Sequence, residues 1–383
     1  MKSLAKTILF ISFEANLEYP NAQTNHTLEL AKALSDQGCQ TTVITSGTVK
    51  NSNSKNFLHI PGDNHEILGS KIKKIKAIIW KNINIYRIAK KHIKESDVIY
   101  ERHHTLGIVG LLLAWRYRKP LYYEVNSLNG EEALYIHGMY GNYISKAFNK
   151  WLKFQLRQSR AVFVQTIELQ DLVRNIYELD NVAVVPNGAA LTARASKVHK
   201  AKNMIQCLYV GAMDDYHSLE SILDIFGGLK KIAHLTVIGG GPNANNLKDR
   251  YSNEVSNITF SGYLKHDEVL RRIKAFDIGL APYNIESPLF KKYGFYFCPM
   301  KLMEYSAAAL PTIIVGASNS LVSVFEDSGA CLVVKKPAGL KKELERLYAE
   351  PDTLSRMSAK ALATGRKFTW HRAAQSTLEV FNA

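Results

Sequence analysis

The sequence predicts a two-domain α/β protein in which each domain is a parallel sheet covered by helices. Its 383 residues are too many for one ordinary core and suggest two domains of about 190 residues each. Short apolar runs alternate with amphipathic helical patterns from end to end, as in parallel sheets with helices on both faces. The polar residues 191–204, after Pro186-Asn187-Gly188, are the best candidate for a linker.

The first half contains six apolar runs that we interpret as buried strands. They are Thr7–Ser12, Thr41–Thr45, Asp97–Tyr100, Pro120–Val125, Ala161–Gln165 and Val182–Val185. Helical patterns such as Thr27–Gln37 and Lys71–Lys94 lie between them. The second half repeats the scheme with Gln206–Val210, Leu235–Ile238, Ile258–Phe260, Ile278–Ala281, Thr312–Val315 and Ala330–Val334.

The composition limits the classes of function. The formal charge of +15 is shared by both halves and favours an anionic partner, but no nucleic-acid-binding motif is visible. The four cysteines lie far apart without partners at metal-ligand spacing, so we expect neither disulfides nor a metal site, and a cytoplasmic location. The apolar run Ile8–Ile11 is too short for a signal-peptide core, and Leu106–Trp115 is about half of a membrane span.

The doubly wound architecture directs attention to the loops that follow the strands. In such folds ligands bind outside the carboxyl ends of the strands. The loop after the first strand, residues 13–25, lacks the G-x-G-x-x-G pattern of a dinucleotide site. In the second half, Gly239-Gly240-Gly241 follows a strand and allows either a close approach of backbone to ligand or a plain tight turn.

The stretch CPMKLMEYSAAALP, residues 298–311, predicts a short helix that begins near Pro299. The backbone N–H groups of Met300 and Lys301 are expected to be unpaired at its start, where the helix dipole favours an anion. Lys301 adds a positive charge, and Glu304 is suited to accept hydrogen bonds from vicinal hydroxyls such as those of a ribose. The alternative is an ordinary Lys–Glu pair on a solvated helix.

Several motifs together resemble family 4 of the retaining glycosyltransferases, which have the GT-B fold of two Rossmann-like domains. They follow one another along most of the chain: Val184–Gly188, Leu208–Gly211, Val237–Pro242, Phe260–Tyr263, Asp277–Pro282 and Pro299–Tyr305. The resemblance implies an N-terminal acceptor domain (1–190), a nucleotide-sugar domain (191–367) and a C-terminal helix (368–383) that crosses back to the first domain.

The resemblance also implies roles for residues of the second half. Glu304 would hold the ribose of a nucleotide-sugar, expected to be a UDP-sugar, and the start of its helix would receive the diphosphate. The remaining donor-binding positions are Lys301, Met300, Pro299, Gly211, His217, Gly240, Gly241, Gly262, Tyr263 and Tyr296.

Three departures from the family pattern concern the same site. Tyr296 stands where the family often has a second glutamate, on the donor sugar. Ala212 and His217 occupy places where an arginine and a lysine often contact the diphosphate, and residues 21–25 replace paired glycines after the first strand. Other cations, among them Lys291, Lys292 and Lys301, would then take over the phosphate, or donor binding would be weak or altered.

In the first half, Tyr100–Gly110 and Tyr122–Ser127 resemble a subset of the same family. Arg102 and Asn126 would lie at strand ends and act in catalysis together with Glu304. Glu131, Glu132 and Asn25 are assigned to the acceptor. Glu124 is either part of the site or a buried, paired structural carboxylate.

The segment 71–94 contains nine Lys and Arg and no acidic residue, with isoleucines near one face. This pattern predicts either docking on an anionic membrane or an ordinary surface helix that packs its isoleucines on the sheet.

The expected activity is therefore transfer of a hexose-type sugar from a nucleotide diphosphate to a hydroxyl acceptor, as in the synthesis of a glycolipid, a polysaccharide or a small glycoside. No metal or cofactor is expected, because no D-x-D motif of the metal-dependent GT-A class occurs. The alternatives are a non-catalytic GT-B homologue that serves as a binding or scaffold subunit, and a GT-B sugar-nucleotide epimerase.

Overall fold

The computed structural model describes residues 6–16, 22–46, 57–61, 71–104, 106–135, 142–193, 195–199, 204–214 and 217–383. The chain forms two compact units. Unit 1 comprises residues 1–187 together with 370–383, and unit 2 comprises residues 188–369. The prediction of two parallel α/β domains is confirmed, because all strand pairs in both sheets are parallel.

Unit 1 is built on a seven-stranded sheet with the order β3-β2-β1-β4-β5-β6-β7. Its strands are β1 (Thr7–Asn16), β2 (Gln40–Ser46), β3 (Phe57–Pro61), β4 (Val98–Arg102), β5 (Leu121–Glu124), β6 (Ala161–Val164) and β7 (Val182–Val184). The strand order reverses between β1 and β4, so the carboxyl ends of these two strands flank the crevice where ligands bind in such sheets.

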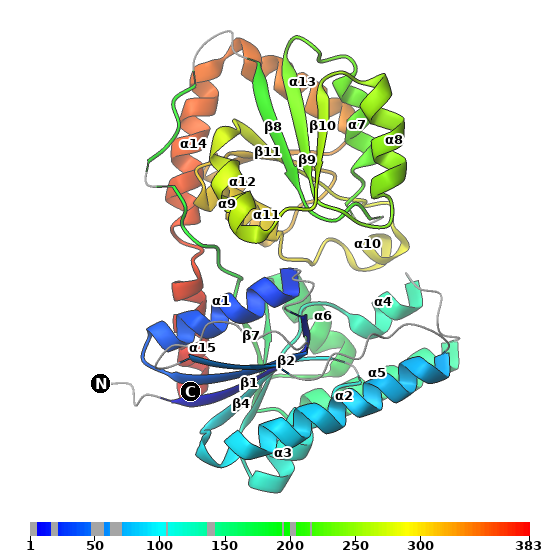
Figure 1. Cartoon of the computed structure of the whole chain (residues 1–383), viewed down its shortest axis with the longest axis vertical. Coiled ribbons are helices and arrows are strands. Elements are labelled where there is room, and N and C mark those ends of the chain that lie inside the picture. The colour runs from blue at the N-terminus through cyan, green and yellow to red at the C-terminus, as the bar shows by residue number, and fades with distance from the viewer. Residues whose placement is uncertain are drawn as a thin grey trace. The chain divides into compact units, whose positions relative to one another are not determined.

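The helices of unit 1 lie on both faces of this sheet. They are α1 (Ala22–Asp36), α2 (Lys71–His92), the 3-10 turn η1 (Ile93–Glu95), α3 (Val109–Tyr117), α4 (Asn129–Tyr135), α5 (Asn142–Arg157), α6 (Ile167–Tyr177) and α15 (Trp370–Asn382). Figure 1 shows α1 and α15 together on one face and α2 and α3 on the other. Phe381 of α15 packs against Tyr122 with ring centroids 4.5 Å apart, so the C-terminal helix completes the core of unit 1.

Unit 2 contains a six-stranded sheet with the order β10-β9-β8-β11-β12-β13, the strand order of a dinucleotide-binding fold. Its strands are β8 (Ile205–Val210), β9 (Ala233–Ile238), β10 (Ile258–Gly262), β11 (Ile278–Pro282), β12 (Thr312–Val315) and β13 (Cys331–Val334). The order reverses between β8 and β11, which places the switch point of this sheet beside the residues that follow Val210 and Pro282.

Two helical layers enclose the sheet of unit 2. One core joins the strands to α7 (Glu220–Phe226), α8 (Ala244–Glu254) and α13 (Pro337–Ala349). On the other face lie α9 (His266–Arg272), η2 (Ile273–Ala275), α11 (Met300–Ala307), α12 (Ser320–Asp327) and α14 (Pro351–Gly365), and α10 (Pro288–Tyr293) follows β11.

The candidate linker is tied to unit 2 in its described part. Lys197 Nζ lies 2.5 Å from Asp277 Oδ1, and the backbone N–H groups of Lys197 and His199 donate to Ser358 and Ser355 of α14. Residues 194 and 200–203 of this segment lie outside the described residues. The boundary between the units therefore falls before the segment, between Asn187 and Gly188.

Candidate functional site

A buried lysine marks the switch point of the sheet in unit 2. Lys301 belongs to the first turn of α11, and only 9% of its surface is exposed. Its ammonium lies 5.3 Å from the ring centroid of Tyr209 and 5.8 Å from that of Tyr283, the residue that follows β11. The alternative of a solvated Lys–Glu pair is therefore wrong for Lys301, which packs beneath the strand ends.

The electrostatics of Lys301 follow from its burial. Desolvation lowers the pKa of Lys301 to about 8, although the negative charges of Asp214 and Glu304 act in the opposite direction and raise it. At neutral pH the ammonium is mostly protonated, yet it lacks the full hydration of a surface lysine. A buried cation of this kind gains more from an incoming anion than an exposed one does.

Asp214 and His217 both interact electrostatically with Lys301. Of these two residues, only His217 was predicted from the sequence to bind the donor. The ring Nδ1 of His217 lies 2.7 Å from Asp214 Oδ1. Burial and the charge of Lys301 lower the pKa of His217, so its imidazole is neutral at pH 7. Burial raises the pKa of Asp214, but its hydrogen bonds with His217 and the charge of Lys301 outweigh this, and the carboxyl stays ionised.

Glycine turns form the floor of the same site. A Cβ at Gly211 would lie 2.7 Å from Lys301 Cε, and one at Gly239 would overlap the carbonyl oxygen of Gly211. Gly239 donates to the carbonyl of Gly262, and Met213 donates to that of Gly240, so the turns after β8, β9 and β10 are joined. Gly241 has a φ of 143°, and a Cβ there would lie 2.8 Å from the backbone of Met213.

The start of α11 differs from the sequence-based expectation in one respect. The helix begins at Met300, with Pro299 just before it, and the N–H of Met300 donates to the carbonyl of Cys298 at 3.0 Å. The expectation that this N–H is unpaired is therefore wrong. Glu304 lies one turn further along, half-buried.

Two of the predicted donor residues, Tyr296 and Tyr263, differ in burial. Tyr296 is fully buried and packs its ring against Phe297, with centroids 4.5 Å apart. Tyr263 follows β10 and is 61% exposed. Tyr296 thus fills an aromatic core that also includes Phe290.

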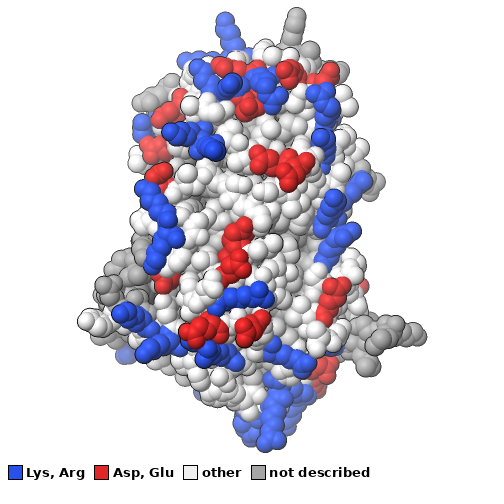
Figure 2. All heavy atoms as spheres, turned by 180° about the vertical axis from the view of Figure 1, so that it is seen from behind, with Lys and Arg blue, Asp and Glu red and all other residues white. Residues whose placement is uncertain are grey.

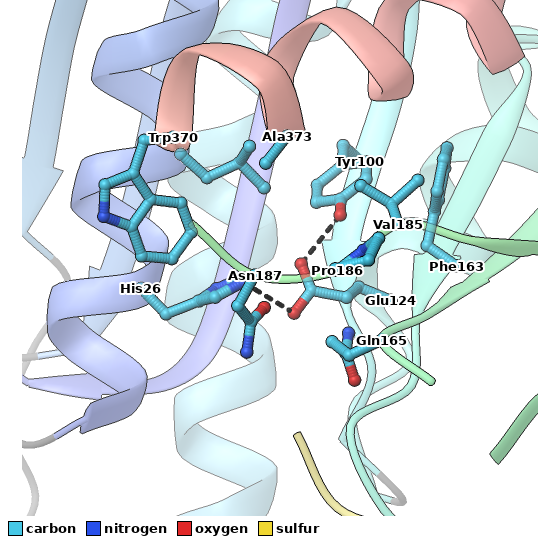
Figure 3. A pocket seen from close by; sticks show the side chains of 11 residues that line it. His26, Tyr100, Glu124, Phe163, Gln165, Val185, Pro186, Asn187, Trp370 and Ala373 are labelled. Atoms are coloured by element: carbon cyan, nitrogen blue, oxygen red, sulfur yellow. Dashed lines mark hydrogen bonds and ion pairs between the residues drawn. The ribbon is translucent and has the colours of Figure 1, made fainter. Parts of the chain in front are cut away.

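A second polar cluster lies at the strand ends of unit 1. Figure 3 shows the carboxylate of Glu124 between Tyr100 and His26, beside a small cavity of about 10 Å³. Tyr100 donates to Glu124 Oε2 at 2.7 Å, and Arg102 Nη1 lies 3.5 Å from Glu124 Oε1. Glu124 is thus a buried, paired carboxylate.

His26 shares Arg102 with this carboxylate. Arg102 Nη1 donates to His26 Nδ1 at 2.8 Å, and because a guanidinium cannot accept, the ring must be neutral with its proton on Nε2. Burial lowers the pKa of His26 to about 4, in agreement with this tautomer. Burial alone would raise the pKa of Glu124, but His26, Arg102 and hydrogen bonds from Tyr100 and Asn126 bring it below the ordinary value.

The structure therefore joins Arg102 and Asn126 through Glu124, but it does not bring all predicted residues of unit 1 to this cluster. Glu131 lies on α4 and accepts a hydrogen bond from Asn149 of α5 at 2.9 Å. Glu132 is half-buried on α4, and Asn25 is half-buried on α1 beside His26 in the chain. His26 was not expected from the sequence, because only the fold brings its side chain, near the start of α1, to Arg102 at the end of β4 and Glu124 at the end of β5.

No described helix is long and apolar enough to cross a membrane. The four cysteines are free. Among the described residues, no three His, Cys, Asp or Glu side chains gather as metal ligands would.

Comparison with known proteins gives matches for both units. Residues 23–192 match Glycosyltransferase Family 4, and residues 205–350 match Glycosyl transferases group 1. A search of the curated proteins gives no significant match to this sequence.

Solved structures share the fold over nearly the whole chain. Sucrose-phosphate synthase from Thermosynechococcus elongatus is 15% identical with a TM-score of 0.75, and the similarity covers 98% of each chain. HepE from Anabaena, in complex with UDP and glucose, is 13% identical with a TM-score of 0.70 and covers 99% of this chain and 100% of its own. WaaG, a glycosyltransferase involved in lipopolysaccharide biosynthesis, is 14% identical with a TM-score of 0.67. The similarity covers 97% of this chain and 99% of the WaaG chain.

Proposed function

Because the two units match glycosyltransferase families in tandem, the chain belongs to the family 4 glycosyltransferases of GT-B fold, and we propose that it transfers a hexose-type sugar from UDP to a hydroxyl acceptor. The anomeric configuration is retained in this proposal, and neither a metal nor a cofactor takes part. The acceptor belongs to a glycolipid, a polysaccharide or a small glycoside.

The observation that carries the proposal is the buried ammonium of Lys301 at the switch point of unit 2. Gly211 and Gly239 have no side chain there, which supports close approach of a diphosphate to the backbone. Lys301 is then the cation that balances the diphosphate, while Glu304, one turn along α11, accepts hydrogen bonds from the ribose hydroxyls.

The departures at Ala212 and His217 fit this assignment. With its pKa lowered, His217 contributes a hydrogen bond and no full charge at neutral pH. Asp214 holds the ring through its Nδ1. The positive charge that many relatives divide between two side chains is thus concentrated on Lys301, and we propose that donor affinity depends on this one residue.

The chemical step in this proposal breaks the bond between the anomeric carbon and the β-phosphate oxygen. The acceptor oxygen bonds to the same face of that carbon, and its proton passes to the leaving phosphate. Lys301 stabilises the charge that grows on the diphosphate. In unit 1 we assign Arg102 and Asn126 to catalysis, and Asn25, Glu131 and Glu132 to the acceptor.

A thermal-shift panel tests the donor site. UDP, UDP-glucose, GDP and ADP are each added to the wild type, to Glu304→Ala and to the control Glu345→Ala, an exposed carboxylate on α13. At about 100 times Kd a ligand stabilises the folded state by about 2.7 kcal/mol. We expect this gain from UDP with the wild type and the control, and its loss in Glu304→Ala.

Turnover then separates an enzyme from a binding subunit. Slow release of glucose from UDP-glucose without acceptor, abolished in Lys301→Met, is expected of a transferase. Absence of stabilisation by every nucleotide would instead favour the non-catalytic homologue. We also propose a cytoplasmic location at the inner face of the cell membrane, with contact through residues 71–94.

A further inference from the structure

Three helices of unit 1 form a surface that the transfer reaction does not use. We call it the α2–α3–α5 surface, because a groove of about 1060 Å³ is lined by residues from all three helices and the turn before α3. Asn82 of α2 fixes one wall by donating to the carbonyl of Leu106 and accepting from the N–H of Ile108. The groove is thus held by defined contacts between α2 and the start of α3.

The groove exposes apolar side chains. Ile79 is 54% exposed, and Ile83, Leu106 and Leu112 are also exposed. Only part of α2 packs on the sheet in the usual manner, through residues such as Ile85, which is fully buried. Such a continuous apolar surface marks a contact with another molecule or with a membrane.

Aromatic side chains extend this surface beyond the groove. Trp115 of α3 is 55% exposed and lies edge-on to Phe154 of α5, with centroids 6.0 Å apart. Trp80 on α2 and Tyr143 at the start of α5 are exposed as well. Tryptophan and tyrosine prefer the boundary between lipid headgroups and acyl chains, because one part of the ring system is apolar and another is polar.

The charge of the three helices has one sign. Together α2, α3 and α5 contain thirteen Lys and Arg and no Asp or Glu. Arg87, Lys90 and Arg116 line the groove itself. Glu178 pairs with Lys153 and Arg157 of α5, which reduces the charge at that end. On the face seen in Figure 2, by contrast, Asp and Glu lie among Lys and Arg.

We propose that the α2–α3–α5 surface docks on an anionic lipid bilayer. The basic side chains attract anionic headgroups, and the isoleucines, leucines and tryptophans enter the boundary of the acyl chains. A second copy of this chain is a poor occupant, because it would bring another strongly basic surface from a protein of net charge +15. The proposal widens the expected contact from residues 71–94 to three helices, and it does not depend on the transfer reaction.

Vesicle flotation of the full chain tests this proposal without donor or acceptor. The probes are vesicles of phosphatidylcholine alone and of phosphatidylcholine mixed with phosphatidylglycerol. We expect recovery only with the mixed vesicles and a fall in recovery with added salt. Because each basic residue near an anionic surface contributes about fivefold in binding, Arg87→Gln with Lys90→Gln is expected to weaken partition by about thirtyfold.

The matched control removes two charges from unit 2. Lys230→Gln with Lys231→Gln alters exposed lysines between α7 and β9 and is expected to bind as the wild type does. A third variant, Ile79→Ser with Leu112→Ser, keeps every charge and is expected to bind more weakly, because less apolar surface enters the bilayer. Circular dichroism confirms that each variant is folded.

Three results would overturn the proposal. They are equal recovery with neutral and mixed vesicles, equal losses from the surface variant and the unit 2 control, and a dimer in solution that the Arg87/Lys90 variant dissociates. The last result would assign the surface to a second copy of the chain.

Discussion

Lys301 is a cation whose chemistry is set by its neighbours more than by its place in the sequence. Its ammonium lies near the rings of Tyr209 and Tyr283 and senses the charges of Asp214 and Glu304. Burial makes the loss of its proton easier, so its charge becomes sensitive to mildly basic pH.

Nucleotide binding is therefore expected to weaken above pH 8. If the diphosphate binds the protonated form of Lys301, the Kd for UDP rises by about tenfold per pH unit once the pH exceeds the pKa of about 8. Isothermal titration from pH 7 to 9.5 measures this profile. Lys301→Arg stays charged over the same range, so its profile should be flat. A wild-type Kd that is constant to pH 9.5 would contradict the assignment.

The same proton acts on folding with the opposite sign. In the unfolded chain the pKa of Lys301 returns to its ordinary value of 10.5, so the unfolded state binds the proton more tightly. The free energy of unfolding without ligand is thus expected to rise as the pH increases from about 8 toward 10.5, where other groups allow it. The free energy of unfolding is measured in urea at each pH for the wild type and for Lys301→Met, and the difference between the two isolates this contribution.

Arg102 is expected to stabilise unit 1 chiefly by compensating Glu124. Arg102→Met leaves a carboxylate buried without its cation, and the loss of one partner of a buried pair costs about 3–5 kcal/mol. Adding Glu124→Gln should recover part of this loss. Urea unfolding of both single variants and the double variant gives the coupling, and strictly additive effects would refute a direct interaction.

The pH dependence of that coupling has a defined direction. The folded-state pKa of Glu124 lies below its ordinary value, so its stabilising contribution is present at neutral pH and is lost as the pH falls. The difference in unfolding free energy between the wild type and Glu124→Gln should therefore shrink in acid.

Single residues could be proposed as site residues from the sequence only where they belong to a recognisable motif. Lys301 and Glu304 belong to one helical turn, and one motif made both of them candidates for the donor site. Asp214 and Tyr283 reach Lys301 from the ends of β8 and β11, and no spacing along the chain reveals that proximity. Tyr296 was expected near the donor because of its position in a motif; the fold buries its ring among aromatic residues, and its role toward the donor stays a prediction.

At the scale of elements, the turn after β9 depends on one glycine and tolerates change at the next. Gly239 has a φ of 143°, and a Cβ there would overlap the carbonyl oxygen of Gly211. Gly239→Ala is expected to lower the unfolding free energy by more than about 1 kcal/mol. Around Gly240 nothing lies within 4 Å of an added Cβ, so Gly240→Ala should stay within about 0.5 kcal/mol.

Two measurements on these glycine variants separate folding from binding. Urea unfolding reports stability, and titration with UDP reports donor affinity. Gly240→Ala is expected to remain as stable as the wild type while binding UDP more weakly, if the diphosphate lies against this turn. Equal stability of both variants would contradict the close contact between the turns after β8 and β9.

The strands were predictable because strands buried on both faces appear as continuous apolar runs. Residues Thr312–Val315, for example, were expected as a strand and form β12. Strand β3, Phe57–Pro61, was not expected from the sequence; among the described strands it lies at the edge of the sheet and pairs with β2. An edge strand with His59 and a terminal proline lacks the apolar run that identifies its neighbours.

At the scale of the whole molecule, the two units differ in continuity. Unit 2 is one stretch of chain, whereas unit 1 needs residues 370–383 from beyond unit 2. Helix α15 lies on α1, and Lys6 Nζ donates to the carbonyl of Phe381 at 2.6 Å. The fold class was predictable from repeated patterns. The return of the C-terminal helix to the first domain was expected only from the family resemblance, because its packing depends on contacts between distant segments.

The packing of α15 on unit 1 can be tested at Phe381. Its ring packs against Tyr122, Tyr100 and Phe163, so Phe381→Ala is expected to cost about 3–5 kcal/mol. Hydrogen exchange should show that backbone amides in the strands of unit 1 lose protection, while the slowest-exchanging amides of unit 2 stay protected. Val380→Ala, a half-buried neighbour on the same helix, serves as the control with a smaller effect. Equal deprotection of both units would contradict separate cores.

The discontinuity of unit 1 also sets an order of events at the ribosome. The first 187 residues emerge early, but their sheet keeps Tyr122 and Phe163 uncovered until the segment 370–383 has left the exit tunnel. Unit 2, synthesised later, has all its residues available sooner and is expected to finish folding first. The part of the protein that is translated first would thus be the last to mature.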